Sequence, residues 1–171
     1  METLSRGGVS SGPVSFMRGA DSVAGMIASG GSTRRAAKMV VLNIDHPDIM
    51  RFIRCKAEEE KKVHALMEMG YDMYDLNNPA WSSIQYQNAN NSVRVTDEFM
   101  EAVERDETFA TKFVGNDKPA QEYRARDLMH AIAEAAWESG DPGMQYDTII
   151  NKWHTCPNTG RINASNPCSE Y

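Results

Sequence analysis

The chain has 171 residues, of which 41% are hydrophobic and 25% are charged, a balance typical of a soluble globular protein that forms one domain or part of a larger one. Its formal net charge of −6 argues against a nucleic-acid binder, because such proteins usually present a basic surface. No apolar stretch is long enough to span a membrane, and the N-terminus lacks the build of a signal peptide. We therefore expect a cytoplasmic protein with no nucleic-acid or membrane partner.

The cysteines favour a free thiol over a disulfide or a metal site. Cys55, Cys156 and Cys168 are an odd number at unrelated spacings, so neither a disulfide framework nor a zinc site is indicated. His154 lies near Cys156, but no third or fourth ligand stands at a familiar metal spacing. No metal is predicted, and a reactive thiol is the remaining option.

The N-terminal part predicts a helix between two polar loops, followed by a strand. Residues 1–12 are small and polar, and Pro13 suits the first turn of a helix that ends at Gly30 and Gly31. Residues 38–44, "KMVVLNI", are apolar and β-branched, as in a buried strand. Apolar residues then recur at helical spacing after Pro47, which predicts a strand followed by an amphipathic helix.

The middle of the chain repeats this order after an irregular segment. Residues 57–69 are strongly helix-forming, with glutamates preceding lysines. Residues 71–91 are rich in asparagine and aromatic residues and predict a long excursion, a kind of loop that is often functional. Residues 92–95, "SVRV", alternate as in a strand, and Thr96 suits the N-cap of the next helix.

The C-terminal part predicts a helix, a third strand and a loop. Residues 123–140 form a helical pattern that ends at Gly140, a natural position for a helix-terminating glycine. Residues 144–153, "MQYDTIINKW", offer a third candidate strand. Residues 154–171 carry Pro, Gly, Asn or Ser at nearly every step and predict a loop. Strands that alternate with helices favour an α/β architecture.

Two loops rich in glycine and serine are candidate phosphate-binding segments. The second, "SGGSTRRAA", combines backbone N–H groups, hydroxyls and two guanidinium groups, all of which bind phosphate oxygens. It matches neither "GxxxxGK[ST]" nor "GxGxxG", so the alternative is a helix stop followed by surface arginines. The first loop, "GGVSSG", lies one helix away and is alternatively an ordinary connector. The candidate residues are Gly7, Gly8, Ser10, Ser11, Gly30, Gly31, Ser32, Thr33, Arg34 and Arg35.

The tail carries an amide, a thiol and a carboxylate at alternating positions, in "SNPCSEY". In an extended segment, Asn166, Cys168 and Glu170 would point to the same side. A functional interpretation makes Cys168 a nucleophile or a redox or radical centre, Glu170 a proton acceptor and Asn166 an orienting donor. The alternative is a turn that holds a buried free cysteine.

Several long motifs of this sequence resemble one known family. "NPCSE" resembles the finger-loop motif Asn-x-Cys-x-Glu of the large, catalytic subunit of ribonucleotide reductase, and "SGDPGMQYDTIINKWHTCPNTGRINAS" resembles the adenosylcobalamin-dependent, class II members. "GGSTRRAAKMVVLNIDHPDIMRFI" resembles the family's specificity region, and "NNSVRVTDEFMEAVERD" resembles its next strand and helix. The likeness extends over nearly the whole chain.

The resemblance implies a ten-stranded α/β barrel made of two half-barrels, with a finger loop through its middle. Residues 1–171 would form part of this catalytic barrel, about its first half. Within it, residues 1–37 would be the specificity loops and their intervening helix, and residues 38–153 the strand and helix units. Residues 154–171 would lead into the finger loop.

The resemblance also implies roles for the tail residues. A thiyl radical on Cys168 would abstract the ribose 3′ hydrogen of a ribonucleoside diphosphate or triphosphate. Glu170 would act as base at the 3′ hydroxyl, and Asn166 would hydrogen-bond near the substrate hydroxyls. Adenosylcobalamin would generate the radical, from a site mostly outside this chain.

By the same resemblance, residues 7–12 and 29–35 would bind a deoxynucleoside triphosphate effector, and the helix between them would lie at a homodimer interface. The family's two redox cysteines have no counterpart here, because Cys55 lies in a helix and Cys156 precedes the finger loop. We therefore expect an internal or N-terminal piece that is inactive alone and needs the remainder of the reductase chain.

Two alternatives stay open. The first is a non-catalytic nucleotide-binding or assembly module, or a remnant, that works only with a partner fragment. The second is a class I subunit that uses a separate radical-generating protein.

Overall fold

The computed structural model describes residues 7–29, 34–35 and 37–171, and its centre is a parallel sheet. The sheet has three strands in the order β3 (Lys38–Asn43), β4 (Ala89–Val95) and β7 (Gly143–Tyr146). Val41 pairs with Ser92, and Ser92 pairs with Gly143, so β4 lies between β3 and β7. This is the mixed α/β architecture that the sequence predicts, although the sheet of the described residues does not close into a barrel.

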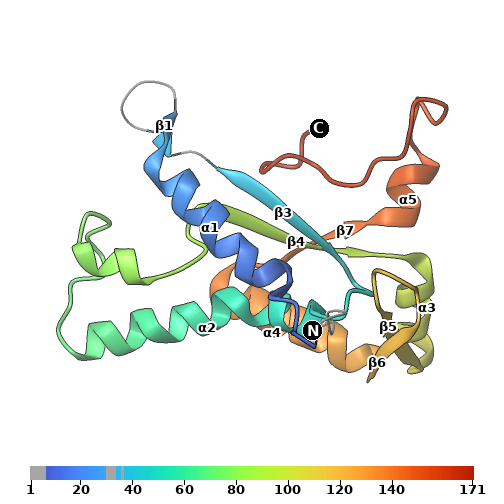
Figure 1. Cartoon of the computed structure of the whole chain (residues 1–171), viewed down its shortest axis with the longest axis horizontal. Helices are drawn as coiled ribbons and strands as arrows, with labels where there is room; N and C mark the ends of the chain where they lie inside the picture. The colour runs from blue at the N-terminus through green and yellow to red at the C-terminus, as the bar shows by residue number, and fades with distance from the viewer. Residues whose placement is uncertain (1–6, 30–33, 36) are drawn as a thin grey trace.

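Within the described residues, five α-helices accompany the sheet: α1 (Gly12–Met26), α2 (Ile49–Glu68), α3 (Asp97–Arg105), α4 (Ala125–Ser139) and α5 (Asp147–Lys152). Helices α2 and α4 pack against each other and lie on one side of the sheet, whereas the C-terminal residues run along the other side (Figure 1). The two sides of the sheet therefore have different partners.

The side of the sheet that faces α2 and α4 is mainly apolar, with Asn91 of β4 as a buried polar exception. Val93 and Val95 of β4 are fully buried there, together with Phe52 of α2 and Leu128 of α4. Alternation along a strand sends Asn90 and Arg94 to the opposite side, where the C-terminal residues lie. The hydrophobic core therefore fills only one side of the sheet.

Two predicted helix boundaries are confirmed in atomic detail. The Thr96 side chain accepts a hydrogen bond from the backbone N–H of Phe99 at 3.3 Å, which caps α3. Gly140 has φ 78°, a left-handed conformation that glycine adopts without strain, and it ends α4.

Other predicted boundaries are wrong. The two helical segments predicted after Pro47 and over residues 57–69 belong to one continuous helix, α2, which begins at Ile49 and ends at Glu68. The third predicted strand, 144–153, ends at Tyr146, and the chain turns into α5 at Asp147, whose side chain binds Arg94 instead of continuing an apolar alternation. Helix α1 ends at Met26, before the predicted glycine stop, and is followed by the hairpin β1 (Ala28–Ser29) and β2 (Arg34–Arg35).

A second hairpin was not expected from the sequence. It pairs β5 (Thr108–Lys112) with β6 (Pro119–Arg124) in antiparallel fashion. In β6, Ala120 and Tyr123 are partly buried and the other side chains are exposed, so the strand lacks a regular apolar alternation. Helix α4 follows directly at Ala125.

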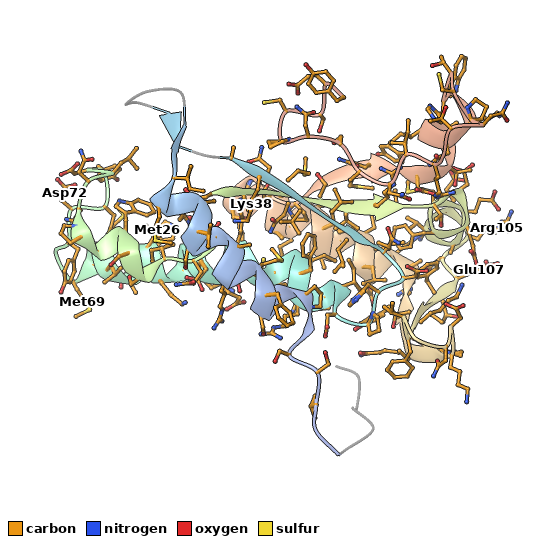
Figure 2. The ribbon with its side chains drawn as sticks, turned by 45° about the horizontal axis from the view of Figure 1, so that its top comes forward. Met26, Lys38, Met69, Asp72, Arg105 and Glu107 are labelled. Carbon is orange, nitrogen blue, oxygen red and sulfur yellow. The ribbon has the colours of Figure 1, made fainter. Side chains whose placement is uncertain are left out.

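The predicted excursion projects beyond the end of α2 and contains the 3₁₀ helix η1 (Pro79–Ser83). In Figure 2, Met69 and Asp72 mark its position, far from Arg105 and Glu107 at the other end of the molecule. It has a small core of its own, in which Met73 and Ile84 pack on Val63 of α2.

Two buried carboxylates hold the return of this excursion into β4. Glu59 Oε2 accepts a hydrogen bond from the Gln85 N–H at 3.0 Å. Asp21 of α1 accepts from the N–H groups of Gln87 and Asn88, each at 3.0 Å, and forms an ion pair with Lys38. The excursion is therefore tied to both α1 and α2.

None of the helices in the described part of the chain is long and apolar enough to cross a membrane.

The core predicts a large stability difference between two leucines. Leu128 is 0% exposed, whereas Leu76, in the excursion, is 62% exposed. We expect Leu128→Ala to lower the free energy of unfolding by about 2–5 kcal/mol, because it removes buried apolar surface and leaves a cavity. Leu76→Ala, the same chemical change on the surface, should cost less than about 0.5 kcal/mol. Urea denaturation followed by circular dichroism measures both, and equal costs would contradict this description of the core.

Candidate functional site

The C-terminal tail, residues 154–171, follows the polar side of the sheet without regular secondary structure, as predicted. Hydrogen bonds from α5 and the sheet hold it at Ile162, Ser165 and Pro167. Asn151 of α5 binds both backbone groups of Ile162, with distances of 3.0 Å to the N–H and 3.1 Å to the carbonyl. Gln145 Nε2 donates to Ser165 Oγ at 2.6 Å, and Asn90 Nδ2 donates to the Pro167 carbonyl at 2.7 Å.

Arg94 connects the sheet to this tail. Its Nε donates to Asp147 Oδ1 at 2.7 Å and its Nη1 to Gln145 Oε1 at 3.0 Å. Its Nη2 donates to the carbonyl of Ile162 at 2.5 Å. The Arg94 side chain is only 2% exposed, so its charge depends on these partners rather than on water.

Asp147 is shared by two arginines. It lies at the first residue of α5 and forms ion pairs with Arg94 and with Arg161 of the tail. Burial by itself would raise the pKa of Asp147, but the hydrogen bonds and charges of Arg94 and Arg161 outweigh it and hold that pKa below its ordinary value. Asp147 is therefore ionised at neutral pH and compensates the buried guanidinium.

The tail residues that carry the predicted chemistry form a turn. Asn166 accepts from the Ser169 N–H through its backbone carbonyl at 2.9 Å, and from the N–H groups of Glu170 and Tyr171 through Oδ1, each at 3.1 Å. Ser169 has φ 61°, in the left-handed region. The extended, alternating geometry considered for this segment is therefore wrong. The turn instead brings the Asn166 amide against the backbone of Glu170, and Cys168 lies exposed at its surface.

A cavity of about 760 Å³ lies at the carboxyl edge of β3 and β4. It is bordered by polar and charged side chains from the sheet, the β5–β6 hairpin and the tail, among them Asn43, His46, Arg94, Lys112, Asp147 and Arg161. The carboxyl ends of parallel strands are where open α/β sheets bind their ligands. The cavity thus adjoins the same tail that carries Cys168.

The residues of the first predicted effector loop lie before α1. Ser10 Oγ accepts a hydrogen bond from the Gly12 N–H at 3.3 Å. Gly12 has φ 71°, and a side chain there would collide with the carboxylate of Asp48, so this position requires glycine. Gly7, Gly8 and Ser11 lie at the protein surface.

The second predicted loop lies at the other end of α1. The backbone of Arg34 pairs with Ser29, and that of Arg35 pairs with Ala28. Gly30, Gly31, Ser32 and Thr33 lie outside the described residues. Helix α1 has 15 residues, which separates its ends by about 22 Å. A single chain therefore does not bring the two loops together around one ligand.

Sequence reasoning missed the polar residues that hold the tail: Asn90, Arg94, Gln145, Asp147 and Asn151. The only signal was Arg94 itself, an arginine placed between two valines in "SVRV". The other residues lie in segments that resemble the family, but nothing in those segments indicated that they hold the tail, because their proximity arises from the parallel pairing of β4 with β7.

Fold and site together define an incomplete parallel α/β unit with a polar tail across one side of its sheet. A family model described as "Ribonucleotide reductase, barrel domain" matches residues 2–171. The chain therefore belongs to the ribonucleotide reductase barrel-domain family.

Its curated relatives are much longer than this chain. It is 60% identical to a protein of Rhodopirellula baltica and 58% identical to one of Streptomyces clavuligerus, both named vitamin B12-dependent ribonucleotide reductase. It is 39% identical to a vitamin B12-dependent ribonucleoside-diphosphate reductase of Mycobacterium tuberculosis. These matches cover 99%, 99% and 97% of this chain but 16%, 18% and 20% of the relatives. The chain thus spans a fifth or less of their length.

The three thiols should differ in reactivity. Cys156 and Cys168 are exposed, whereas Cys55 is buried and burial raises the pKa of its thiol from 9.0 to about 11. We expect a maleimide at pH 8 to modify Cys156 and Cys168 and to spare Cys55 until the chain is unfolded. Because the folded pKa is the higher one, the stability contributed by Cys55 is complete below pH 9 and is lost as the pH rises toward 11. Mass spectrometry of the labelled peptides checks the pattern, and early labelling of Cys55 would contradict the packing of α2.

Proposed function

We propose that this chain is a part of the catalytic barrel of an adenosylcobalamin-dependent ribonucleotide reductase and carries its radical cysteine, Cys168. The observation that carries the proposal is the motif Asn166, Cys168 and Glu170, held by side chains of β4, β7 and α5 on the polar side of a parallel sheet. Family membership and the names of the relatives support the reaction class.

The proposed chemistry assigns one role to each tail residue. Cys168, as a thiyl radical, takes the hydrogen atom from the 3′ carbon of the ribose, and the thiol S–H re-forms. Glu170 accepts the proton of the 3′ hydroxyl, and Asn166 hydrogen-bonds near the substrate hydroxyls. The substrate is a ribonucleoside diphosphate or triphosphate, bound where the tail and the carboxyl edge of the sheet meet.

The exposed position of the Cys168 thiol is compatible with a radical that is generated by another part of the reductase. When bound, adenosylcobalamin supplies the radical that removes the hydrogen atom from the Cys168 thiol. The thiol is exposed on the turn, so a cofactor held by another part of the reductase has access to it. We place most of the cobalamin site outside residues 1–171. A cytoplasmic location is a prediction from the sequence.

The open architecture supports the proposal that the chain is inactive alone. Strands β3 and β7 are the outer strands of the described sheet, so one edge of each has no partner strand within it. Tyr146, the last residue of β7, is 46% exposed. We propose that the remainder of the reductase chain covers these edges and supplies the second half of the barrel.

The effector and the dimer form a further part of the proposal. Helix α1 exposes large apolar side chains at Phe16, Val23 and Met26, and Ile27 follows its end. A second copy of the chain fits this surface, and an antiparallel pair of α1 helices would bring the first loop of one chain beside the β1–β2 hairpin of the other. A deoxynucleoside triphosphate effector would then bind between two chains, with Arg34 or Arg35 near its phosphates.

The alternative function is a non-catalytic nucleotide-binding or assembly module that works only with a partner fragment. In that case the two loops beside α1 would bind the nucleotide, and the exposed edges of β3 and β7 would bind the partner fragment. The two functions differ in whether Cys168 is needed for ribonucleotide reduction.

A chimera tests the catalytic role. This chain replaces the matching segment of the Rhodopirellula baltica protein, and deoxyribonucleotide formation is measured with adenosylcobalamin and a dithiol. We expect Cys168→Ala to lower kcat about a thousandfold or more, because the abstracting sulfur is lost. Cys156→Ser, an exposed cysteine twelve positions earlier, should leave kcat unchanged. Residues 1–171 alone should show no turnover, and a Cys168→Ala chimera as active as its parent would favour the alternative.

Effector binding is tested separately on the arginines of the hairpin. We expect Arg34→Ala and Arg35→Ala together to weaken deoxynucleoside triphosphate binding about tenfold or more, through lost charge-assisted hydrogen bonds. Isothermal titration calorimetry on the chimera measures the change. Arg124→Ala, which removes an arginine that pairs with Asp106 on the β5–β6 side, is the matched control. Equal affinities in all variants would place the effector elsewhere.

A further inference from the structure

Arg94 is the one side chain that contacts β7, α5 and the tail together within the described part of the chain. Its three nitrogens donate to Gln145, to Asp147 and to the carbonyl of Ile162. The guanidinium is planar and its donors are fixed in direction, so three simultaneous bonds fix the relative positions of three elements. A flexible ammonium at this position cannot hold all three partners in the same way.

The Arg94 contacts also determine how Gln145 binds the tail. Arginine has only donors, so the Gln145 atom that faces Nη1 is the amide oxygen, Oε1. The amide nitrogen, Nε2, is thereby turned to Ser165 and donates to its Oγ at 2.6 Å. One arginine therefore holds the tail twice, directly at Ile162 and through Gln145 at Ser165.

This attachment lies close to the reactive turn. Ser165 is bonded to Asn166, and its Oγ lies 3.3 Å from the Oγ of Ser169 at the far side of Cys168. Asn90, four residues before Arg94 on the same side of β4, binds Pro167. The turn that carries Cys168 is therefore held by side chains of β4 and β7, namely Asn90 and Gln145.

We propose that Arg94 is a positioning residue that holds the tail, and with it Cys168, at a fixed place above the sheet. Among the described residues, Arg94 donates hydrogen bonds to Asp147, Gln145 and Ile162 and to none of the triplet Asn166, Cys168 and Glu170. It therefore acts on the triplet through Ile162, Gln145 and Ser165. The consequence for catalysis rests on the proposed function, whereas the consequence for the tail does not. The inference adds a residue to the site that neither the motif nor the family resemblance indicated.

Hydrogen exchange of the 171-residue chain, followed by mass spectrometry, tests the structural part. We expect Arg94→Gln and Arg94→Lys to speed exchange of the peptides that cover residues 160–171 about tenfold or more, the change expected when hydrogen bonds to a charged group are lost. Peptides from α2 and α4 should change less than about twofold. Arg124→Gln, the same change at an arginine whose side chain is 57% exposed, is the matched control. An unchanged tail, or equal acceleration in the tail and the core, would overturn the inference.

Ser165→Ala is a milder second variant that leaves Arg94 and Gln145 in place. Without the hydroxyl, Gln145 Nε2 has no acceptor at position 165, while the bond from Arg94 to the Ile162 carbonyl remains. We therefore expect faster exchange in the residues after position 165, and little change at Ile162. Unchanged exchange after position 165 would show that Gln145 does not transmit the position of Arg94.

The chimera tests the catalytic part. We expect Arg94→Lys to lower kcat about tenfold while the KM for the ribonucleotide changes less than about twofold, because the thiol is displaced and the substrate contacts remain. An equal loss in the Arg124→Lys chimera, or an unchanged kcat in the Arg94→Lys chimera, would overturn a catalytic consequence. If the parent chimera does not reduce ribonucleotides, the proposed function fails, and hydrogen exchange alone decides the role of Arg94.

Discussion

Strand β4 is buried on both sides, and this constraint organises the rest of the molecule. On one side Val93 and Val95 pack among the helices, where burial of apolar surface stabilises the fold at about 25 cal/mol per Å². On the other side Ser92 and Arg94 are buried, and the tail supplies hydrogen bonds to Arg94 and to the exposed Asn90 instead of apolar contacts. A strand with a polar buried side requires a polar partner, so the tail and the sheet depend on each other.

The charge of Arg94 makes this dependence strict. A guanidinium that is 2% exposed is costly to remove from water unless its donors are satisfied and its charge is matched. Asp147 provides the charge, and the first turn of α5 provides its position. Helix α5, which replaces the second part of the predicted third strand, thus positions Asp147 as the counter-ion of Arg94. The same change of structure, from β7 to α5, also places Asn151 against Ile162.

The elements that the sequence predicted well are those set by local chemistry. Thr96 and Gly140 determine helix ends through their own local geometry, and the strand predicted over residues 38–44 forms as β3, Lys38–Asn43, because its central residues are apolar and β-branched. The elements that it missed depend on contacts far along the chain. Strand β7 ends at Tyr146 because Asp147 meets Arg94, which lies 53 positions earlier. No local pattern contains that information.

The site shows the same division. The tail motif was recognisable because Asn166, Cys168 and Glu170 are close in sequence. The extended geometry predicted for them was wrong, because Ser169 adopts a left-handed conformation that turns the chain. In the turn, Oδ1 of Asn166 accepts hydrogen bonds from the backbone N–H groups of Glu170 and Tyr171. Under the proposed function, an Asn166 side chain that binds a ribose hydroxyl has to exchange these bonds for substrate. This exchange would take place over the polar side of the sheet, whereas closure of a barrel would involve the outer edges of β3 and β7.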